Sequence, residues 1–169
     1  MYGTFAIIFG LIACVIGHGQ NDPKDIAADP AHPWIGRWES IDGRHENFEN
    51  FIKHLGLAHY GADNKVYHKF WKEDDHFHHG IAVTEKDFKK FVEFKLGEEG
   101  TLTWNNTEFK YKYTEENKDL HVEVKVPAKD KVVHDTYHVE GEQLVKTYKV
   151  DNVEAKRWFA KATSKPSNT

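Results

Sequence analysis

Residues 107–126 read TEFKYKYTEENKDLHVEVKV. Large apolar side chains alternate with mostly charged ones in this stretch, first from Phe109 to Tyr113 and then from Val122 to Val126. Successive side chains of a strand point to opposite faces, so each run predicts a strand with one face in a core and the other in water. A polar Asn-Lys-Asp sequence lies between the runs, and the whole stretch therefore predicts an antiparallel hairpin.

The same two-residue period recurs along most of the chain and predicts an all-β fold. Every proline lies outside the runs. We expect a ten-stranded antiparallel up-and-down barrel, because closure removes the edges that ten sequential strands would expose and leaves room for a ligand. A two-sheet sandwich is the alternative. The expected strands are residues 36–42, 65–73, 76–84, 87–96, 101–104, 107–115, 119–126, 132–140, 143–150 and 153–161.

One segment follows a helical period instead. Between residues 46 and 55 the apolar side chains Phe48, Phe51, Ile52 and Leu55 recur at the spacing of one helix face. The glycine that follows ends this helix, and residues 57–60 are expected to form a second short one. The two helices would make a helix-turn-helix lid between the first and second strands.

Composition limits the function classes. The 169 residues include 23 Lys plus Arg and 27 Asp plus Glu, which gives a net charge of −4, and both signs are interspersed. Nucleic-acid binding needs a basic surface, so no nucleic-acid partner is expected. The chain also lacks a Gly-x-Ser-x-Gly motif, a phosphate-binding glycine loop and a His-Glu-x-x-His motif. We therefore predict neither an enzyme nor a cofactor.

The first residues differ in composition from all the others. Residues 1–19 contain no charged side chain, and residues 5–16 are apolar apart from one glycine. This run is too short to span a bilayer and predicts a signal peptide, hence a secreted protein. A frayed apolar arm and lipidation at Cys14 are the alternatives. Cys14 and Met1 are the only sulfur-containing residues, so the mature chain would contain no sulfur.

We expect four parts in the chain. After the signal peptide, the leader is rich in Asp-Pro and His-Pro pairs, and the last residues have a loose, polar composition. The parts are a signal peptide at 1–19, an extended leader at 20–33, the β-barrel domain at 34–162 and a flexible tail at 163–169.

Several segments resemble known families. IGRWES at 35–40, ENFENFIK at 46–53, FKLGEE at 94–99 and RWF at 157–159 are similar to the fatty-acid-binding proteins. A closer resemblance, to the secretory abundant heat-soluble proteins of tardigrades, is carried by VYHKFWKE at 66–73, DHFHH at 75–79, NNTE at 105–108 and AKRWF at 155–159. It implies an exported barrel associated with tolerance of desiccation.

The resemblance also implies a ligand site inside the barrel. Arg157 matches the arginine that holds a ligand carboxylate in fatty-acid-binding proteins. Side chains alternate between the two faces of a strand, and this alternation predicts that Arg157 points inward. The tyrosine of the family is replaced by Phe159, and the position of its second arginine aligns near Thr136. The head-group site therefore lacks two of the polar side chains that the family uses. Trp38, Phe51 and Tyr148 are the other expected ligand contacts. The alternative is a structural Arg157 that closes the barrel end with a carboxylate.

The sequence suggests two further kinds of site. His76 and His78 lie on one face of an expected strand and could share a Zn²⁺ or Cu²⁺ ion, although clustering by chance explains them as well. Asn105 begins an Asn-Asn-Thr acceptor for N-glycosylation in an expected turn. We predict no dedicated metal site.

The functional prediction has two branches. The first is a secreted, heat-soluble barrel that protects extracellular or secretory contents, both proteins and membranes, during desiccation. The alternative is a secreted carrier of a fatty acid or a similar small amphipath. A monomer is expected in both cases, and the depleted head-group site favours protection.

Overall fold

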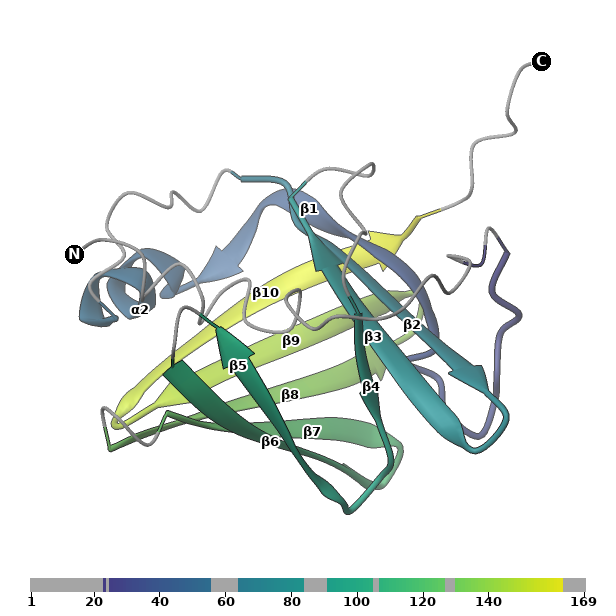
Figure 1. The fold of residues 1–169 in the computed structure, drawn as a ribbon. Coiled ribbons are helices and arrows are strands. Elements are labelled where there is room, and N and C mark those ends of the chain that lie inside the picture. Colours follow the sequence, from purple (N-terminus) through teal and green to yellow (C-terminus); the bar gives the residue numbers. More distant parts are fainter. Residues whose placement is uncertain are drawn as a thin grey trace.

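Ten antiparallel strands form one sheet that curls into a nearly closed barrel (Figure 1). The computed structural model of the chain describes residues 23, 25–55, 64–83, 91–104, 107–126 and 130–162. Around the sheet the strand order is β4-β3-β2-β1-β10-β9-β8-β7-β6-β5. One continuous sheet confirms the barrel and excludes the two-sheet sandwich. The strands are β1 (Gly36–Glu46), β2 (Tyr67–Glu73), β3 (His76–Ala82), β4 (Phe91–Phe94), β5 (Glu99–Trp104), β6 (Thr107–Glu116), β7 (Asp119–Val126), β8 (Lys131–Glu140), β9 (Gln143–Val150) and β10 (Val153–Lys161).

The first strand is longer than its sequence predicts. β1 continues beyond residue 42 because Gly43, with φ 68°, accommodates an irregularity in the pairing with β10, after which Glu46 pairs with Lys156. Asn47 then adopts a left-handed φ of 51° and separates the strand from helix α2 (Phe48–His54). The expected helix start at residue 46 was therefore wrong by two residues. The expected second helix at 57–60 lies outside the described residues.

Helix α2 covers one end of the barrel. It packs against β10 (Figure 1) and buries Phe48, Phe51 and Ile52. These side chains form a small core cluster with Tyr148 and Val150 of β9. Seven residues make a short helix, and nowhere in the described ranges is a helix long and apolar enough to cross a membrane.

A second, larger core cluster fills the rest of the barrel. It contains the fully buried side chains of Trp34, Trp38, Phe70 and Phe159, among others. Phe94 and Tyr113 stack in this cluster with their ring centroids 3.7 Å apart. Apolar burial in these two clusters is the main stabilising contribution to the fold.

The leader is attached to the barrel at the end away from α2 (Figure 1). Ile26 packs against the larger core cluster, although the sequence predicts an extended segment outside the domain. Glu115 of β6 binds the leader through one oxygen, Oε2, which accepts a hydrogen bond from Trp34 Nε1 at 2.6 Å and lies 2.8 Å from His32 Nδ1. These contacts extend the packed unit toward the N-terminus beyond Trp34.

Candidate functional site

Polar side chains point into the barrel between the two core clusters. The strand register places Arg157 of β10 opposite Lys146 of β9, and Lys146 opposite Tyr137 of β8. His68 of β2 contacts the same region through its ring, whose centroid lies 5.3 Å from that of Tyr137. We call this group the interior polar cluster; its members are His68, His79, Tyr113, Asp135, Tyr137, Lys146, Tyr148 and Arg157.

A buried ion pair lies at the centre of the interior polar cluster. Lys146 Nζ is 2.9 Å from Asp135 Oδ2, and the two side chains are only 5% and 11% exposed. Burial lowers the pKa of Lys146 and outweighs the opposing effect of Asp135. The ammonium also lies 4.2 Å from the ring centroid of Tyr148, a cation–π distance. Removing two charges from water costs free energy that their mutual attraction barely offsets. The pair is therefore expected to add little to the stability of the fold, and a specific role is the better explanation for its presence.

Arg157 points inward, as parity predicts. It shares the buried face of β10 with Ala155 and Phe159. Its Nη2 donates to Ser40 Oγ at 3.2 Å and to the carbonyl oxygen of Asn64. Its guanidinium carbon lies 5.2 Å from the ring centroid of Phe48. Arg157 thus joins the barrel interior to the end covered by α2.

Two buried histidines extend the cluster toward β6. His68 Nδ1 lies 3.0 Å from His79 Nε2, and His79 Nδ1 lies 3.0 Å from the hydroxyl of Tyr113. Burial is the main cause that lowers the pKa of both histidines well below the ordinary value, and the nearby charge of Lys146 lowers both further. Both imidazoles are therefore neutral at pH 7.

Three polar atoms of the cluster are buried without a hydrogen-bond partner among the described residues. They are His68 Nε2, Asp135 Oδ1 and the hydroxyl of Tyr137. Buried polar atoms are nearly always satisfied, since an unsatisfied one costs about 1–3 kcal/mol. Three such atoms in one cluster make this the least satisfied polar region among the described residues of the barrel interior.

The structure divides the five predicted ligand contacts into two groups. Arg157, Tyr148 and Phe51 lie together at the α2 end, where the rings of Phe51 and Tyr148 are 5.5 Å apart. Trp38 and Phe159 belong to the larger core cluster. Tyr148 lies beside the ion pair, with its ring 4.2 Å from Lys146 Nζ, and Arg157 lies opposite Lys146 in the strand register. Phe159 approaches the interior polar cluster through His68, at a ring distance of 4.9 Å.

The expected alignment of a family arginine near Thr136 does not mark an interior position. Thr136 contacts His121 Nδ1 at 3.2 Å, on the opposite face of β8 from the buried Asp135 and Tyr137. The second interior cation is instead Lys146. The sequence analysis did not identify Lys146, although it lies on the same face of β9 as Leu144 and Tyr148.

The candidates for metal binding and glycosylation lie elsewhere. His76 and His78 share the outer face of β3, but His76 lies 2.7 Å from Asp75, whereas His78 is buried and stacks on Trp71 with ring centroids 4.8 Å apart. The described part of the chain contains no group of three or more side chains able to hold a metal ion. The expectation of no dedicated metal site, with His76 and His78 as the candidate ligands, stays a prediction. Asn105 lies outside the described residues.

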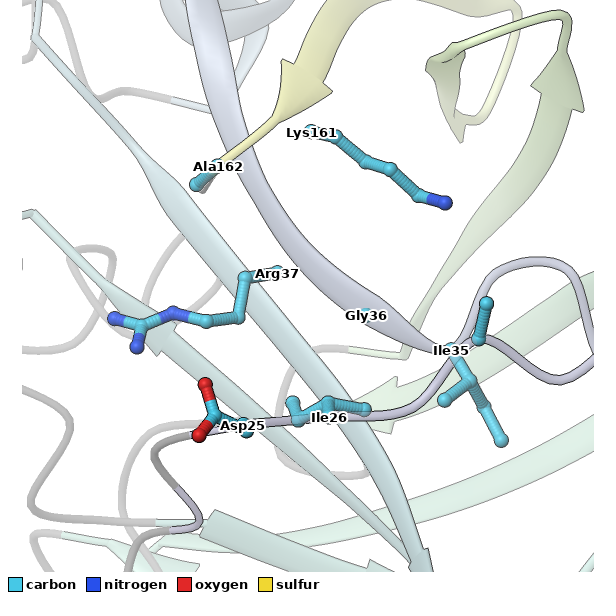
Figure 2. Close-up of a pocket in the computed structure, with 8 residues that line it drawn as sticks. Asp25, Ile26, Ile35, Gly36, Arg37, Lys161 and Ala162 are labelled. Atoms are coloured by element: carbon cyan, nitrogen blue, oxygen red, sulfur yellow. The ribbon is translucent and has the colours of Figure 1, made fainter. Parts of the chain in front are cut away.

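A surface pocket of about 190 Å³ lies outside the barrel wall, between the leader and the ends of β1 and β10. Figure 2 shows Asp25 and Arg37 on one side of it, with the Lys161 side chain extending away from them. None of the residues predicted to contact a ligand lines this pocket. The interior polar cluster is therefore the stronger candidate site.

No protein-family model matches the chain. The chain is, however, 49% identical over 167 residues to secretory-abundant heat soluble protein 1 of Ramazzottius varieornatus, a match that covers 94% of this chain and 97% of that protein. It is 48% identical over 168 residues to a secretory-abundant heat soluble protein of a Hypsibius species, with 95% and 94% covered. The chain belongs to the secretory-abundant heat soluble protein family.

Solved structures agree with this assignment. A secretory-abundant heat soluble protein of Ramazzottius varieornatus superposes with a TM-score of 0.70 at 55% identity, covering 76% of this chain and 95% of that one. Fatty-acid-binding protein 1 of Echinococcus granulosus superposes with a TM-score of 0.63 at 25% identity, with 77% and 98% covered. The resemblance to both families is confirmed. The relatives are named secretory-abundant proteins, and membership of their family makes this a secreted protein. The expected signal peptide at residues 1–19 lies outside the described residues and stays a prediction.

Proposed function

We propose that this family member protects proteins and membranes outside the cell or in the secretory pathway during water loss. The observation that carries the proposal is the pairing of opposite charges on the outer surface. Lys65 lies 2.8 Å from Glu39, and Lys95 lies 2.8 Å from Asp75. All four side chains are at least 35% exposed.

These pairs have different effects in water and in a drying solution. In water an exposed ion pair contributes about 0–1 kcal/mol. As water leaves, the effective dielectric constant around the pair falls. For two unit charges 4 Å apart, the attraction is about 1 kcal/mol at the dielectric constant of water, about 80, and about 4 kcal/mol at a dielectric constant of about 20. On a surface with paired charges, each charged side chain therefore keeps a partner of opposite charge as water leaves. The exposed polar groups can then replace water at the surface of a neighbouring protein or lipid.

Drying lactate dehydrogenase with the mature protein tests the proposal. Recovered activity should exceed that obtained with equal masses of albumin and of an ordinary intracellular fatty-acid-binding protein. Recovery no better than with the ordinary fatty-acid-binding protein would contradict the proposal, because the fold alone would then explain the effect.

Charge variants test the paired surface itself. Replacing Lys65, Lys95 and Lys131 by Gln removes cations that contact Glu39, Asp75 and Asp151. We expect little change in urea stability and a clear loss of protection after drying. The matched control replaces Lys53, Lys149 and Lys156, which carry the same charge but form no ion pair within the described ranges. Equal protection by the two triple variants would refute the role of the pairs.

A second candidate function is the transport of a small amphipath, and the interior polar cluster favours it. Lys146 supplies a second buried cation where the sequence predicted a depleted site. If a carboxylate ligand binds Arg157, then Arg157→Ala should weaken binding by about 1.5–3 kcal/mol, roughly 10- to 150-fold. Binding of a fatty alcohol should change less. Arg44→Ala is the control, because Arg44 bonds Gln143 on the exposed surface. Equal affinity of Arg157→Ala and the wild type would place Arg157 in a structural role.

A further inference from the structure

We propose that Asp42 and Gly43 form a site of spontaneous backbone modification, where the chain closes a succinimide ring when the protein is dried and opens it to isoaspartate when water returns. Asp42-Gly43 is the only Asp-Gly pair in the sequence, which contains no Asn-Gly pair. The reaction needs no enzyme, because the attacking nitrogen and the carboxyl group that it attacks belong to neighbouring residues.

The chemistry uses atoms of these two residues only. The backbone nitrogen of Gly43 attacks Cγ of Asp42, so that an N–Cγ bond forms and one Cγ–O bond breaks. The departing oxygen takes the amide hydrogen and one proton from the solvent and leaves as water, and a five-membered ring remains. Water can later break either carbonyl–nitrogen bond of the ring. Breaking the new bond restores aspartate, whereas breaking the original one leaves a backbone that runs through Cβ and Cγ, which is isoaspartate.

Glycine at position 43 leaves the attacking nitrogen uncrowded. A side chain on the residue after an aspartate hinders the approach of its nitrogen to Cγ, and glycine has none. Apart from its chain neighbours, no heavy atom lies within 4 Å of the place that a Cβ of Gly43 would occupy. The surroundings therefore leave room for the ring.

The sheet does not hold these two residues in a hydrogen-bonded ladder. The pairs of β1 with β10 stop at Ser40 and resume at His45, and its pairs with β2 end at Glu39. Among the described residues, Asp42 and Gly43 therefore have no backbone partner in either register. A segment with few backbone bonds moves more easily than the core of a strand, so the nitrogen can turn toward Cγ without global unfolding.

Water and protons reach the site from the solvent. The Asp42 side chain is 81% exposed, and Gly43 is exposed as well. Lys65 Nζ lies 3.1 Å from Asp42 Oδ1 and favours the charged carboxylate, which is the less reactive form. An exposed ion pair changes an equilibrium by about fivefold at most, so Lys65 slows the reaction without preventing it.

Drying favours the ring, because ring closure releases a water molecule and ring opening consumes one. The ring therefore accumulates in the dry protein and opens on rehydration. Isoaspartate lengthens the backbone by one carbon atom, within a part of β1 that already has more residues than the facing part of β10. The barrel should therefore stay folded after the change.

Hydroxylamine cleavage of the mature protein, stored dry and warm from a neutral buffer, tests the proposal, because hydroxylamine cuts a chain at a succinimide. The dried protein should lose the mass of one water and should be cut between residues 42 and 43. After rehydration the tryptic peptide 38–44 should separate into two forms of equal mass, one of which accepts a methyl group from an isoaspartate methyltransferase.

Two controls isolate the site. Asp151 is an exposed turn residue followed by Asn152, and cleavage there should be at least about 10-fold weaker because asparagine has a side chain. Asp42→Glu keeps the charge but would need a six-membered ring, so cleavage at position 42 should nearly disappear. Equal cleavage at Asp42 and Asp151, or intact dried wild type, would overturn the proposal.

A synthetic peptide of residues 38–44, dried beside the protein, tests the structural part of the argument. The folded protein should form the ring within about threefold of the rate of the peptide, because the sheet does not restrain the site. A folded protein that reacts more than about 10-fold more slowly than the peptide would overturn the proposal, since the fold would then protect the site.

Discussion

Acid should destabilise this protein through the two histidines buried inside the barrel. In the folded state the pKa of His68 and of His79 lies well below the ordinary value of 6.5, mainly because burial penalises the charged form. The unfolded chain therefore binds more protons than the folded one once the pH falls below about 6.5. Stability is fully present above that pH and decreases as the solution becomes more acidic.

The magnitude follows from the number of groups. Each histidine can contribute a slope of about 1.4 kcal/mol per pH unit between its unfolded and folded pKa values. Two histidines thus give up to about 4 kcal/mol between pH 6.5 and 5, a large part of the roughly 5–15 kcal/mol typical of a small domain. Protonation would also place new positive charge beside Lys146, which adds to the cost.

Urea unfolding followed by tryptophan fluorescence measures the effect, because Trp34 and Trp38 are fully buried. The free energy of unfolding should fall steeply below pH 6.5. His68→Asn should lose about half of this slope, since one of the two titrating groups is removed. His138→Asn is the control, because His138 is 54% exposed and pairs with Asp119 at the surface. An identical slope in His68→Asn and wild type would refute the reasoning.

Two other predictions concern the ion pair and the N-terminus. Lys146→Met should cost about 3–5 kcal/mol in urea unfolding, because it leaves Asp135 buried without its cation, whereas the same change at the exposed Lys149 should cost little. A smaller loss at Lys146 than at Lys149 would show that the pair is not buried as described. Expressed in a eukaryotic secretory cell, the chain should reach the medium without residues 1–19, and N-terminal sequencing that begins at Met1 would contradict this expectation.

The strands could be predicted from the sequence because their signal is local. Alternation with a period of two depends only on neighbouring residues, and the expected bounds of β7, β9 and β10 agree with the structure. Parity along β10 also predicted that Arg157 points inward, and the buried positions of that strand confirm it. The start of helix α2 was predicted less well, since the left-handed Asn47 and the pairing of Glu46 with β10 depend on the folded sheet.

Tertiary structure alone decided the composition of the site and the position of the leader. Lys146 and Asp135 appear as ordinary charged residues of amphipathic strands, and only the register of β8 with β9 places one beside the other in the interior. The leader is held by Glu115, which is separated from Trp34 by 81 positions in the sequence. Local periodicity specifies which face a side chain occupies. It does not specify the distant partner that makes burial of a charge or attachment of a polar segment favourable, because that partner is brought near only when the barrel closes.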